Sequence, residues 1–352
     1  MKPTDSSEVA TDGGSVDEAP FEVVATDTER SNTDRLVKYL DRVVFPPLRI
    51  VWDDRRAKVG LAIVTLYALM GTVGVVYTTP PRPNEGEAMV GVFRSSEFIL
   101  GTDALGQGIL RQIIHGTPAM LEMIIAGSLF TTVVATVVGT LSGYKRGTVD
   151  SVLMLITDVA MTIPGLPLVI VVAVIFEPRE PFLIGIIIAI NAWAGLARTI
   201  RSQVLSIRNE SYVEASRVMG FSTPNILVED LLPNLMPYVV VNLVYSARNV
   251  IFASVGLYFL GFLPFTTTNW GVMMYYANET GGALYSFSSA HWIVAPMITV
   301  IVLTFGLILL AQSTDRLFNP RVRARHAKTI QAEGGETVEE GASAAEEVAG
   351  RA

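Results

Sequence analysis

Six segments of this chain are long and apolar enough to cross a membrane, and they constrain the fold more than any other feature. A hydrocarbon core about 30 Å thick requires about 20 helical residues. Half of all residues (50%) are hydrophobic, as is typical of a chain that lies mostly in lipid. The sequence therefore predicts an all-α, polytopic membrane protein with six transmembrane helices. These helices are expected over 59–78, 119–142, 151–176, 182–200, 235–263 and 292–312.

The remaining segments divide the chain into parts. Residues 1–34 and 319–352 are acidic and poor in large apolar residues, so both are predicted to be disordered tails. The opening residues lack the apolar core of a signal peptide. Residues 35–58 mix charged and apolar side chains and are expected to lie along the cytoplasmic membrane surface. The transmembrane domain is expected over 59–318, with a long external loop at 79–118.

Basic residues gather on one side of the predicted spans. Lys and Arg are enriched in cytoplasmic loops, so their distribution sets the orientation. Both termini and the loop at 201–234 are therefore predicted to be cytoplasmic, in a multi-pass protein of the cell membrane. The basic residues on this side are Arg49, Arg55, Arg56, Lys58, Lys145, Arg146, Arg198, Arg201, Arg208, Arg217, Arg316, Arg321, Arg323, Arg325 and Lys328. Only Arg82, Arg94, Arg111 and Arg179 lie on the other side.

Several kinds of chemistry are not expected from these residues. The chain has no cysteine, which excludes disulfides and thiol nucleophiles. His115, His291 and His326 lie in different segments, so no metal site is predicted. No Gly-Lys pair occurs, and therefore no phosphate-binding loop of the G-x-x-x-x-G-K-[ST] type. We predict neither catalysis nor a cofactor nor nucleic-acid binding.

The cytoplasmic loop begins with a pattern that favours a short helix. Ser211 and Glu214 have the spacing of a capping box, in which a hydroxyl and a carboxylate satisfy free amides at a helix start. Glu214 then has two interpretations. It is a capping residue only, or it belongs with the small residues Ala215 and Ser216 to a low surface that a partner contacts.

The same loop contains signals for a turn and a second helix. Gly220 suits the left-handed position that ends a helix. Thr223 and Pro224 suit the cap and first position of the next helix. Pro233 is expected to stop that helix before the fifth span.

Ionisable groups within spans cost about 2.5–3.5 kcal/mol at mid-bilayer on insertion scales, so each must face protein or water. Asp158 is either a pathway carboxylate or, as we favour, an anchor bonded to neighbouring helices. Arg248 either lines a pore or pairs with an acidic partner such as Asp158. Pro164 predicts a mid-span kink that either shapes a pore or serves packing.

Ordered motifs identify a family resemblance. The run from Tyr212 to Gly220 reads YVEASRVMG and is followed by Leu232-Pro233-Asn234. This resembles the EAA loop of ABC-importer permeases. More narrowly, residues 50–325 resemble the second permease subunit of dipeptide, oligopeptide and nickel importers. The further matching motifs are Gly101-Thr102-Asp103-Ala104-Leu105-Gly106, Asp158 with Ile163-Pro164-Gly165, Trp193 to Arg201, Gly256-Leu257 with Phe259-Leu260-Gly261, and Trp270-Gly271.

The resemblance implies an ABC type I importer permease fold and a transport function. The chain would form half of a translocation pore for di- or oligopeptides. Its partners would be a homologous second permease, two cytoplasmic ATPase subunits, an external substrate-binding protein and the lipid bilayer. The implied ATPase-docking residues are Glu214, Ala215, Ser216, Gly220, Leu232 and Pro233; the pore candidates are Asp158, Pro164, Arg248 and Ser254.

Two departures from the family pattern and two alternatives remain. Glu229-Asp230 replaces a basic pair that is usual in the second loop helix, which implies a more basic ATPase surface. Ser254 stands where relatives often have a glutamate, and Arg248 is a candidate replacement. The cargo is alternatively nickel or an oligosaccharide. The alternative class is a stand-alone secondary carrier. Such a carrier is expected to show inverted repeats, which we do not find in this sequence, and it would have no use for the loop at 209–234.

Overall fold

The computed structural model describes residues 54–265 and 267–318, with side chains up to Thr314. Within this part the chain is helical, has no β-strand and contains one isolated β-bridge between Thr102 and Gly108. The predicted tails at 1–34 and 319–352 lie outside the described residues, as does most of 35–58. The expected all-α class is confirmed.

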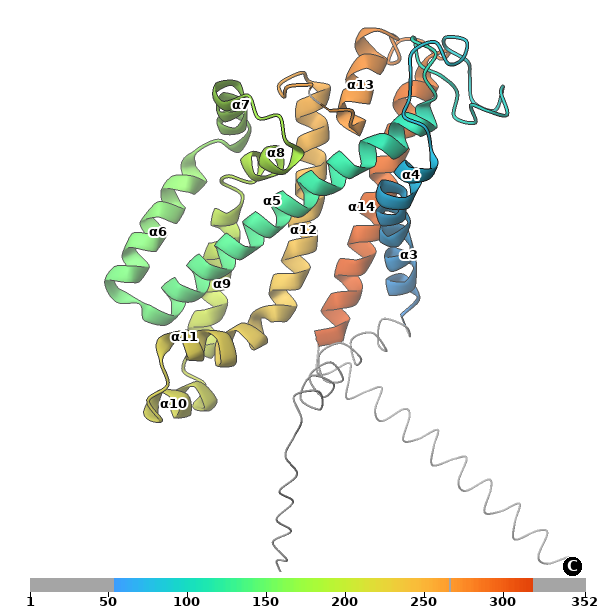
Figure 1. Ribbon diagram of the computed structural model, residues 1–352. Helices are drawn as coiled ribbons and strands as arrows, with labels where there is room; N and C mark the ends of the chain where they lie inside the picture. The colour runs from blue at the N-terminus through green and yellow to red at the C-terminus, as the bar shows by residue number, and fades with distance from the viewer. Residues whose placement is uncertain (1–53, 266, 319–352) are drawn as a thin grey trace, which may run out of the picture. The chain divides into compact units, whose positions relative to one another are not determined.

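Four continuous helical segments are long and apolar enough to cross a membrane (Figure 1). They coincide with the first, second, fifth and sixth predicted spans. Their bounds are α3 (Arg55–Leu69) with η1 (Met70–Gly74) and α4 (Val75–Tyr77), α5 (Ile109–Lys145), α11 (Thr223–Asn225) with η2 (Ile226–Leu231) and α12 (Leu232–Phe259), and α14 (Ala290–Phe318).

The third and fourth predicted spans are bent pairs, and six spans result if each pair counts as one. Helices α6 (Gly147–Thr162) and α7 (Gly165–Phe176) meet at 87°, and α8 (Pro181–Ile188) and α9 (Trp193–Ile207) meet at 60°. Pro164 therefore produces a full break and not a kink, with extended backbone at φ −62° and ψ 120°.

The break in the fourth span was not predicted. Its cause is a short run of backbone bonds between residues three apart, from Ala189 to the Ile186 carbonyl and from Ala192 to the Ala189 carbonyl. Such 3₁₀-type bonds wind the chain more tightly than an α-helix and change its direction. The fourth span has no proline at this point, so no residue there signalled the break.

Helix α5 lies against α8, α9 and α12 and crosses two of them very closely. A Cβ atom on Gly185 of α8 would lie 2.4 Å from the Met123 carbonyl oxygen of α5. A Cβ on Gly139 of α5 would lie 2.6 Å from the Ala197 carbonyl oxygen of α9. Small residues permit such close backbone approach between membrane helices, where lipid supplies no hydrophobic driving force.

Helix α13 (Trp270–Glu279) is fixed by the larger of two apolar cores. Trp270 is fully buried, donates its indole N–H to the Ile113 carbonyl oxygen at 3.2 Å and meets the ring of Tyr67 edge-on. Tyr67 in turn donates its hydroxyl to the Thr299 carbonyl oxygen at 2.7 Å. These bonds join α3, α5, α13 and α14.

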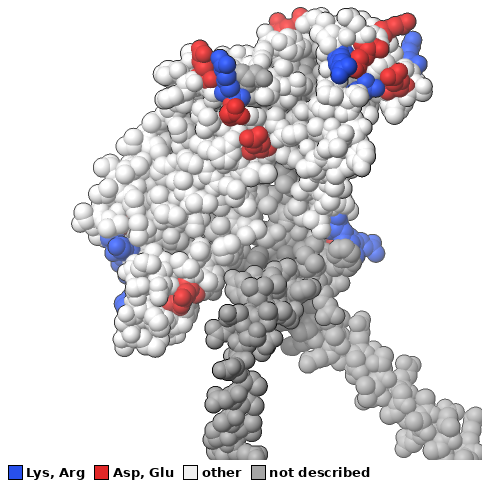
Figure 2. Space-filling view, viewed as in Figure 1, with Lys and Arg blue, Asp and Glu red and all other residues white. Residues whose placement is uncertain are grey.

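The second apolar core continues from the spans into the 201–234 loop. Ile200, Val204 and Leu235 from the helices pack with Val213 and Leu231 from the loop. The loop is therefore part of the folded body and not a loose connection. Figure 2 shows charged side chains gathered toward the two ends of the viewed face, with a mostly uncharged band between them, as lipid contact requires.

Candidate functional site

The candidate site is the loop at 201–234, which is predicted to be cytoplasmic. Its first helix is α10 (Ser211–Val218). Val213 and Ser216 form the buried face of this helix. Val213 belongs to the same core as Ile226 of η2 and Val204 of α9. Helix α10 thus rests on a base built from two other elements and presents its opposite face outward.

The start of α10 differs from the predicted capping box. The N-cap is Glu210, whose carbonyl accepts the backbone N–H groups of Val213 and Glu214 at 3.0 and 3.1 Å, and no side chain caps this end. Because extended backbone ends at Glu210, Ser211 is already the first helical residue and its hydroxyl lies one position too late to cap. The carboxylate of Glu214 is exposed and bonds to no other described residue.

The end of α10 follows the prediction. Gly220 has φ +79°, and the Phe221 N–H returns to the Ser216 carbonyl oxygen at 3.1 Å while the Gly220 N–H bonds to Arg217. This is the left-handed helix end that favours glycine. A Cβ at Gly220 would meet nothing within 4 Å, so only the backbone conformation demands glycine there.

The second loop helix does not stop at Pro233, and this prediction was wrong. Ser222 is the N-cap and Thr223 the first helical residue, one position earlier than expected. The helix then passes through the π-helical turn Ile226–Leu231 directly into α12. The wider π turn gives the ring of Pro233 room and needs no N–H from it, so the proline does not end the helix.

The exposed surface of the loop is more apolar than the sequence motif implied. Glu214, Ala215 and Gly220 are exposed as predicted for a docking surface, and so is Pro233, with Leu232 partly buried. Ser216, also assigned to docking, is instead buried against other residues of the same chain.

Three residues that the motif did not single out dominate that surface. Val218, Met219 and Phe221 are 83%, 66% and 49% exposed. We call Val218, Met219 and Phe221 together the apolar tip. Their sequence signal was three large apolar residues close to Gly220, where the first loop helix ends.

The loop is tied to the turn between α5 and α6. Arg208 donates to the Tyr144 carbonyl oxygen at 3.2 Å, and the Arg217 guanidinium lies over the Tyr144 ring at 5.6 Å. Arg201 binds Asp150 through two bonds of 2.6 Å each, a bidentate geometry. These contacts join α10 and the end of α9 to α5 and α6.

Partial burial, together with the negative charges of Glu210 and Asp230, raises the pKa of the Tyr212 hydroxyl. That hydroxyl accepts the Asn234 side-chain amide at 3.2 Å. Asn234 also donates to the Asp230 carbonyl oxygen at 2.7 Å. The asparagine of the Leu232-Pro233-Asn234 motif thus joins α10 to the helix that follows the loop.

The ionisable residues of the spans are placed in different surroundings. Asp158 pairs with Arg198 of α9, and both side chains are about half exposed. This bond to a neighbouring helix agrees with the anchor interpretation, while a pathway role stays a prediction. The suggested pair between Arg248 and Asp158 does not form: Asp158 pairs with Arg198, and Arg248 donates to Asn249. Ser254 is fully buried and donates to the Ile251 carbonyl oxygen at 3.0 Å, so it faces its own helix.

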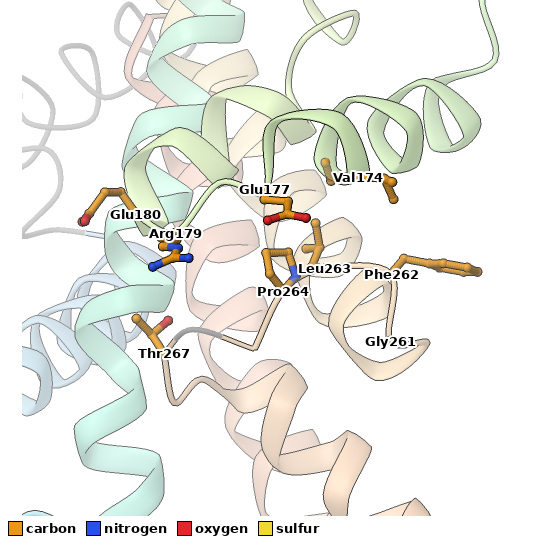
Figure 3. A pocket seen from close by; sticks show the side chains of 10 residues that line it. Val174, Glu177, Arg179, Glu180, Gly261, Phe262, Leu263, Pro264 and Thr267 are labelled. Carbon is orange, nitrogen blue, oxygen red and sulfur yellow. The ribbon is translucent and has the colours of Figure 1, made fainter.

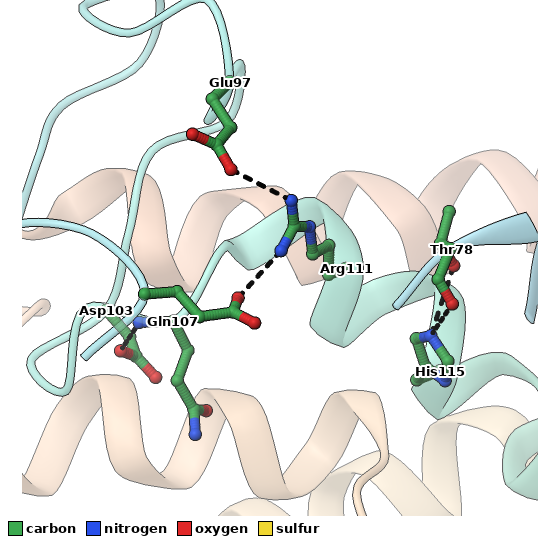
Figure 4. Close-up of polar contacts among 7 residues, drawn as sticks. Thr78, Glu97, Asp103, Gln107, Arg111 and His115 are labelled. Atoms are coloured by element: carbon green, nitrogen blue, oxygen red, sulfur yellow. Dashed lines mark hydrogen bonds and ion pairs between the residues drawn. The ribbon is translucent and has the colours of Figure 1, made fainter. Parts of the chain in front are cut away.

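The motif Gly101 to Gly106 forms a turn (Figure 4) at the end of the spans opposite to α10 (Figure 1). One oxygen of Asp103 accepts the N–H groups of Leu105 and Gln107 at 2.8 Å each, and the other accepts the Gln112 amide at 2.8 Å. Figure 4 also shows Arg111, which bonds to Glu97 and, at 2.9 Å, to Glu85. Helix α5 starts directly after this turn, at Ile109, ahead of the second predicted span at 119–142.

A cavity of about 670 Å³ lies on the same side (Figure 3). Glu177, Arg179 and Glu180 line it from the connection between α7 and α8. Phe262 and Leu263 line it from the segment after α12. Within the described residues no group of three His, Cys, Asp or Glu side chains is placed to hold a metal ion.

The bent and continuous membrane helices, joined by an ordered loop, place the chain among polytopic helical membrane proteins. The family described as binding-protein-dependent transport system inner membrane component matches residues 135–324, and the chain belongs to this family. It is an inner-membrane permease component of a binding-protein-dependent ABC importer, which confirms the resemblance seen in its motifs.

Within this family, the chain is similar to permease subunits of dipeptide and oligopeptide transport systems. The chain is 28% identical over 275 residues to the dipeptide transport system permease protein DppC of Bacillus subtilis (strain 168), covering 77% of this chain and 83% of the relative. It is 28% identical over 222 residues to the oligopeptide transport system permease protein OppC of the same strain, covering 63% and 72%. A solved structure, an inward-facing conformation of the MetNI methionine ABC transporter, matches with a TM-score of 0.45 and 19% identity, covering 57% of this chain and 95% of that chain.

Proposed function

We propose that this chain forms one half of a translocation pore for di- and oligopeptides and couples it to a cytoplasmic ATPase through the 201–234 loop. The second half would be a homologous permease, with two ATPase subunits and an external substrate-binding protein completing the importer. ATP hydrolysis would occur in the ATPase subunits alone. Both termini and the acidic tails would lie in the cytoplasm, on the side of the loop.

One observation carries the coupling proposal. The buried face of α10 is held by the chain's own core through Val213. Glu214 is exposed on the helix, and the apolar tip is exposed at and just beyond its C-terminal end. A connecting loop in water gains nothing from exposing three large apolar side chains, whereas a protein interface buries them. The bonds from Arg201 and Arg208 to the α5–α6 turn would make the loop a stiff lever.

The first test is purification of the tagged chain from gently solubilised membranes, with mass spectrometry of the proteins that accompany it. A second permease and ATPase subunits should be recovered. Recovery of the chain alone, in a detergent that keeps a known ABC importer intact, would favour a stand-alone secondary carrier. Uptake assays with the recovered binding protein would separate peptide cargo from nickel or an oligosaccharide.

Glu214→Ala should weaken association with the ATPase by about tenfold or more, the value of a hydrogen bond to a charged group. The folded loop should be unaffected, because the carboxylate bonds to no described residue. The measurement is copurification of the ATPase at graded salt, with Glu214→Gln separating loss of charge from loss of shape. Unchanged copurification of both variants would show that Glu214 is no docking residue.

Met219→Asp should remove ATPase copurification altogether, because a charge buried in an apolar interface without a partner is strongly unfavourable. Met219 is two-thirds exposed, so the chain itself should still fold. Tyr285→Asp is the matched control, since Tyr285 is 90% exposed but lies between α13 and α14, far along the chain from the loop. Equal behaviour of the two variants would contradict docking at the apolar tip.

A further inference from the structure

Arg248 is the only charged residue in α12 and lies near the middle of that 28-residue helix. It also lies near the centre of the predicted span at 235–263. At 1.5 Å per helical residue, about 16 Å or more of helix separates it from either end. The side chain therefore cannot reach the membrane surface simply by extending along the helix.

The two side chains that contact the Arg248 guanidinium are neutral. Its Nη2 donates to the Asn249 side-chain oxygen at 3.2 Å, and its guanidinium carbon lies 5.7 Å from the centre of the Tyr245 ring. Its Nε is buried and has no hydrogen-bond partner. The ion pairs within the described residues do not include it, and Asp158 is already bound to Arg198. The positive charge is thus held in place but not neutralised by this part of the chain.

The face of α12 beside Arg248 is open. Tyr245, Asn249 and Phe252 are exposed and follow one another at helical spacing. A Cβ on Gly256, one turn further on, would meet nothing within 4 Å. Lipid does not solvate a guanidinium, so this stripe requires a polar environment, either a translocation pathway or another polar surface.

We propose that Arg248 binds the carboxylate of the peptide as it passes through the membrane. The inference rests on the proposed function, because peptide cargo supplies the anion. A guanidinium presents paired N–H donors that match a carboxylate bidentately. Tyr245 and Asn249 orient the group toward the open stripe while leaving its charge available. The site thus takes the carboxylate of di- and oligopeptides and has no direct counterpart for a neutral sugar.

The test uses the whole importer in proteoliposomes with its binding protein at saturating concentration. Uptake of a peptide is compared with uptake of its C-terminal amide, for a peptide pair that the binding protein accepts in both forms. The variants are Arg248→Gln, Arg248→Lys and, as the matched control, Arg198→Gln, which removes a span arginine that already has a carboxylate partner. Because the binding protein is the same throughout, its preferences cancel when variants are compared.

Arg248→Gln should lower uptake of the free peptide about tenfold or more and leave uptake of the amide unchanged, since a hydrogen bond to a charged group is lost for one cargo only. Arg248→Lys should be intermediate, and Arg198→Gln should affect both cargoes equally. Equal loss for both cargoes with Arg248→Gln, no loss, or failure of that variant to assemble with the second permease would overturn the inference. If the wild-type importer takes up neither peptide, the peptide cargo itself is wrong, and the inference fails with it.

Discussion

Gly220→Pro should abolish ATP-dependent uptake while the chain still inserts into the membrane. Gly220 has φ +79°, and the proline ring fixes φ near −65°, so the chain cannot leave α10 in its present direction. Proline also removes the N–H that bonds to the Arg217 carbonyl oxygen at 3.1 Å. The apolar tip and the entry into α12 would be misdirected together, whereas no span would be altered.

The open space around Gly220 makes a graded series informative. A Cβ there meets nothing within 4 Å, so within this chain each substitution acts through the backbone conformation alone. Gly220→Asn should retain most uptake, because asparagine tolerates the left-handed region. Gly220→Ala should be intermediate, at a cost of about 1–2 kcal/mol. Uptake would be measured in membranes with equal amounts of inserted chain, and wild-type uptake by the proline variant would refute the lever.

Among the helical glycines that the structure describes, Gly185→Ala should cause the largest loss of stability. The new Cβ would lie 2.4 Å from the Met123 carbonyl oxygen and 2.9 Å from its Cα. Backbone atoms of a packed helix cannot move aside as the end of a flexible side chain can. Helices α5 and α8 would have to separate, and overpacking of this kind costs about 3 kcal/mol.

Gly195→Ala is the matched control for that substitution. Gly195 is also helical, in α9, but a Cβ there meets nothing within 4 Å. This variant should be as stable as the wild type or slightly more stable, because alanine favours helix by up to about 1 kcal/mol over glycine. The measurement is the thermal midpoint of the solubilised chain by loss of its monodisperse size-exclusion peak. Equal midpoints for the two alanine variants would contradict the close crossing of α5 and α8.

The sequence by itself determined the parts of this protein that depend on local composition. Apolar length located the four continuous spans and the two bent helix pairs, since about 30 Å of hydrocarbon requires about 20 apolar helical residues. Gly220 predicted the end of α10, because few other residues tolerate its left-handed backbone conformation. The ordered motifs identified the permease family, which the match over residues 135–324 confirms.

Where the sequence failed, the outcome depended on partners remote in the chain. A predicted hydroxyl cap at Ser211 gave way to a helix that starts one residue earlier, on a base set by the core around Val213. The helix continues through Pro233 because a π turn precedes it. The fourth span is broken although it has no proline at the break.

Only the tertiary structure decided which polar residues have partners and which apolar residues lie exposed. Asp158 and Arg248 looked like a possible pair because both are isolated in apolar segments. The fold instead gives Asp158 to Arg198 and leaves Arg248 with neutral neighbours. Likewise, the EAA motif drew attention to Ser216, whereas packing buries it and exposes Met219. Spacing along a chain fixes local conformation, but burial and pairing are set by which helices meet.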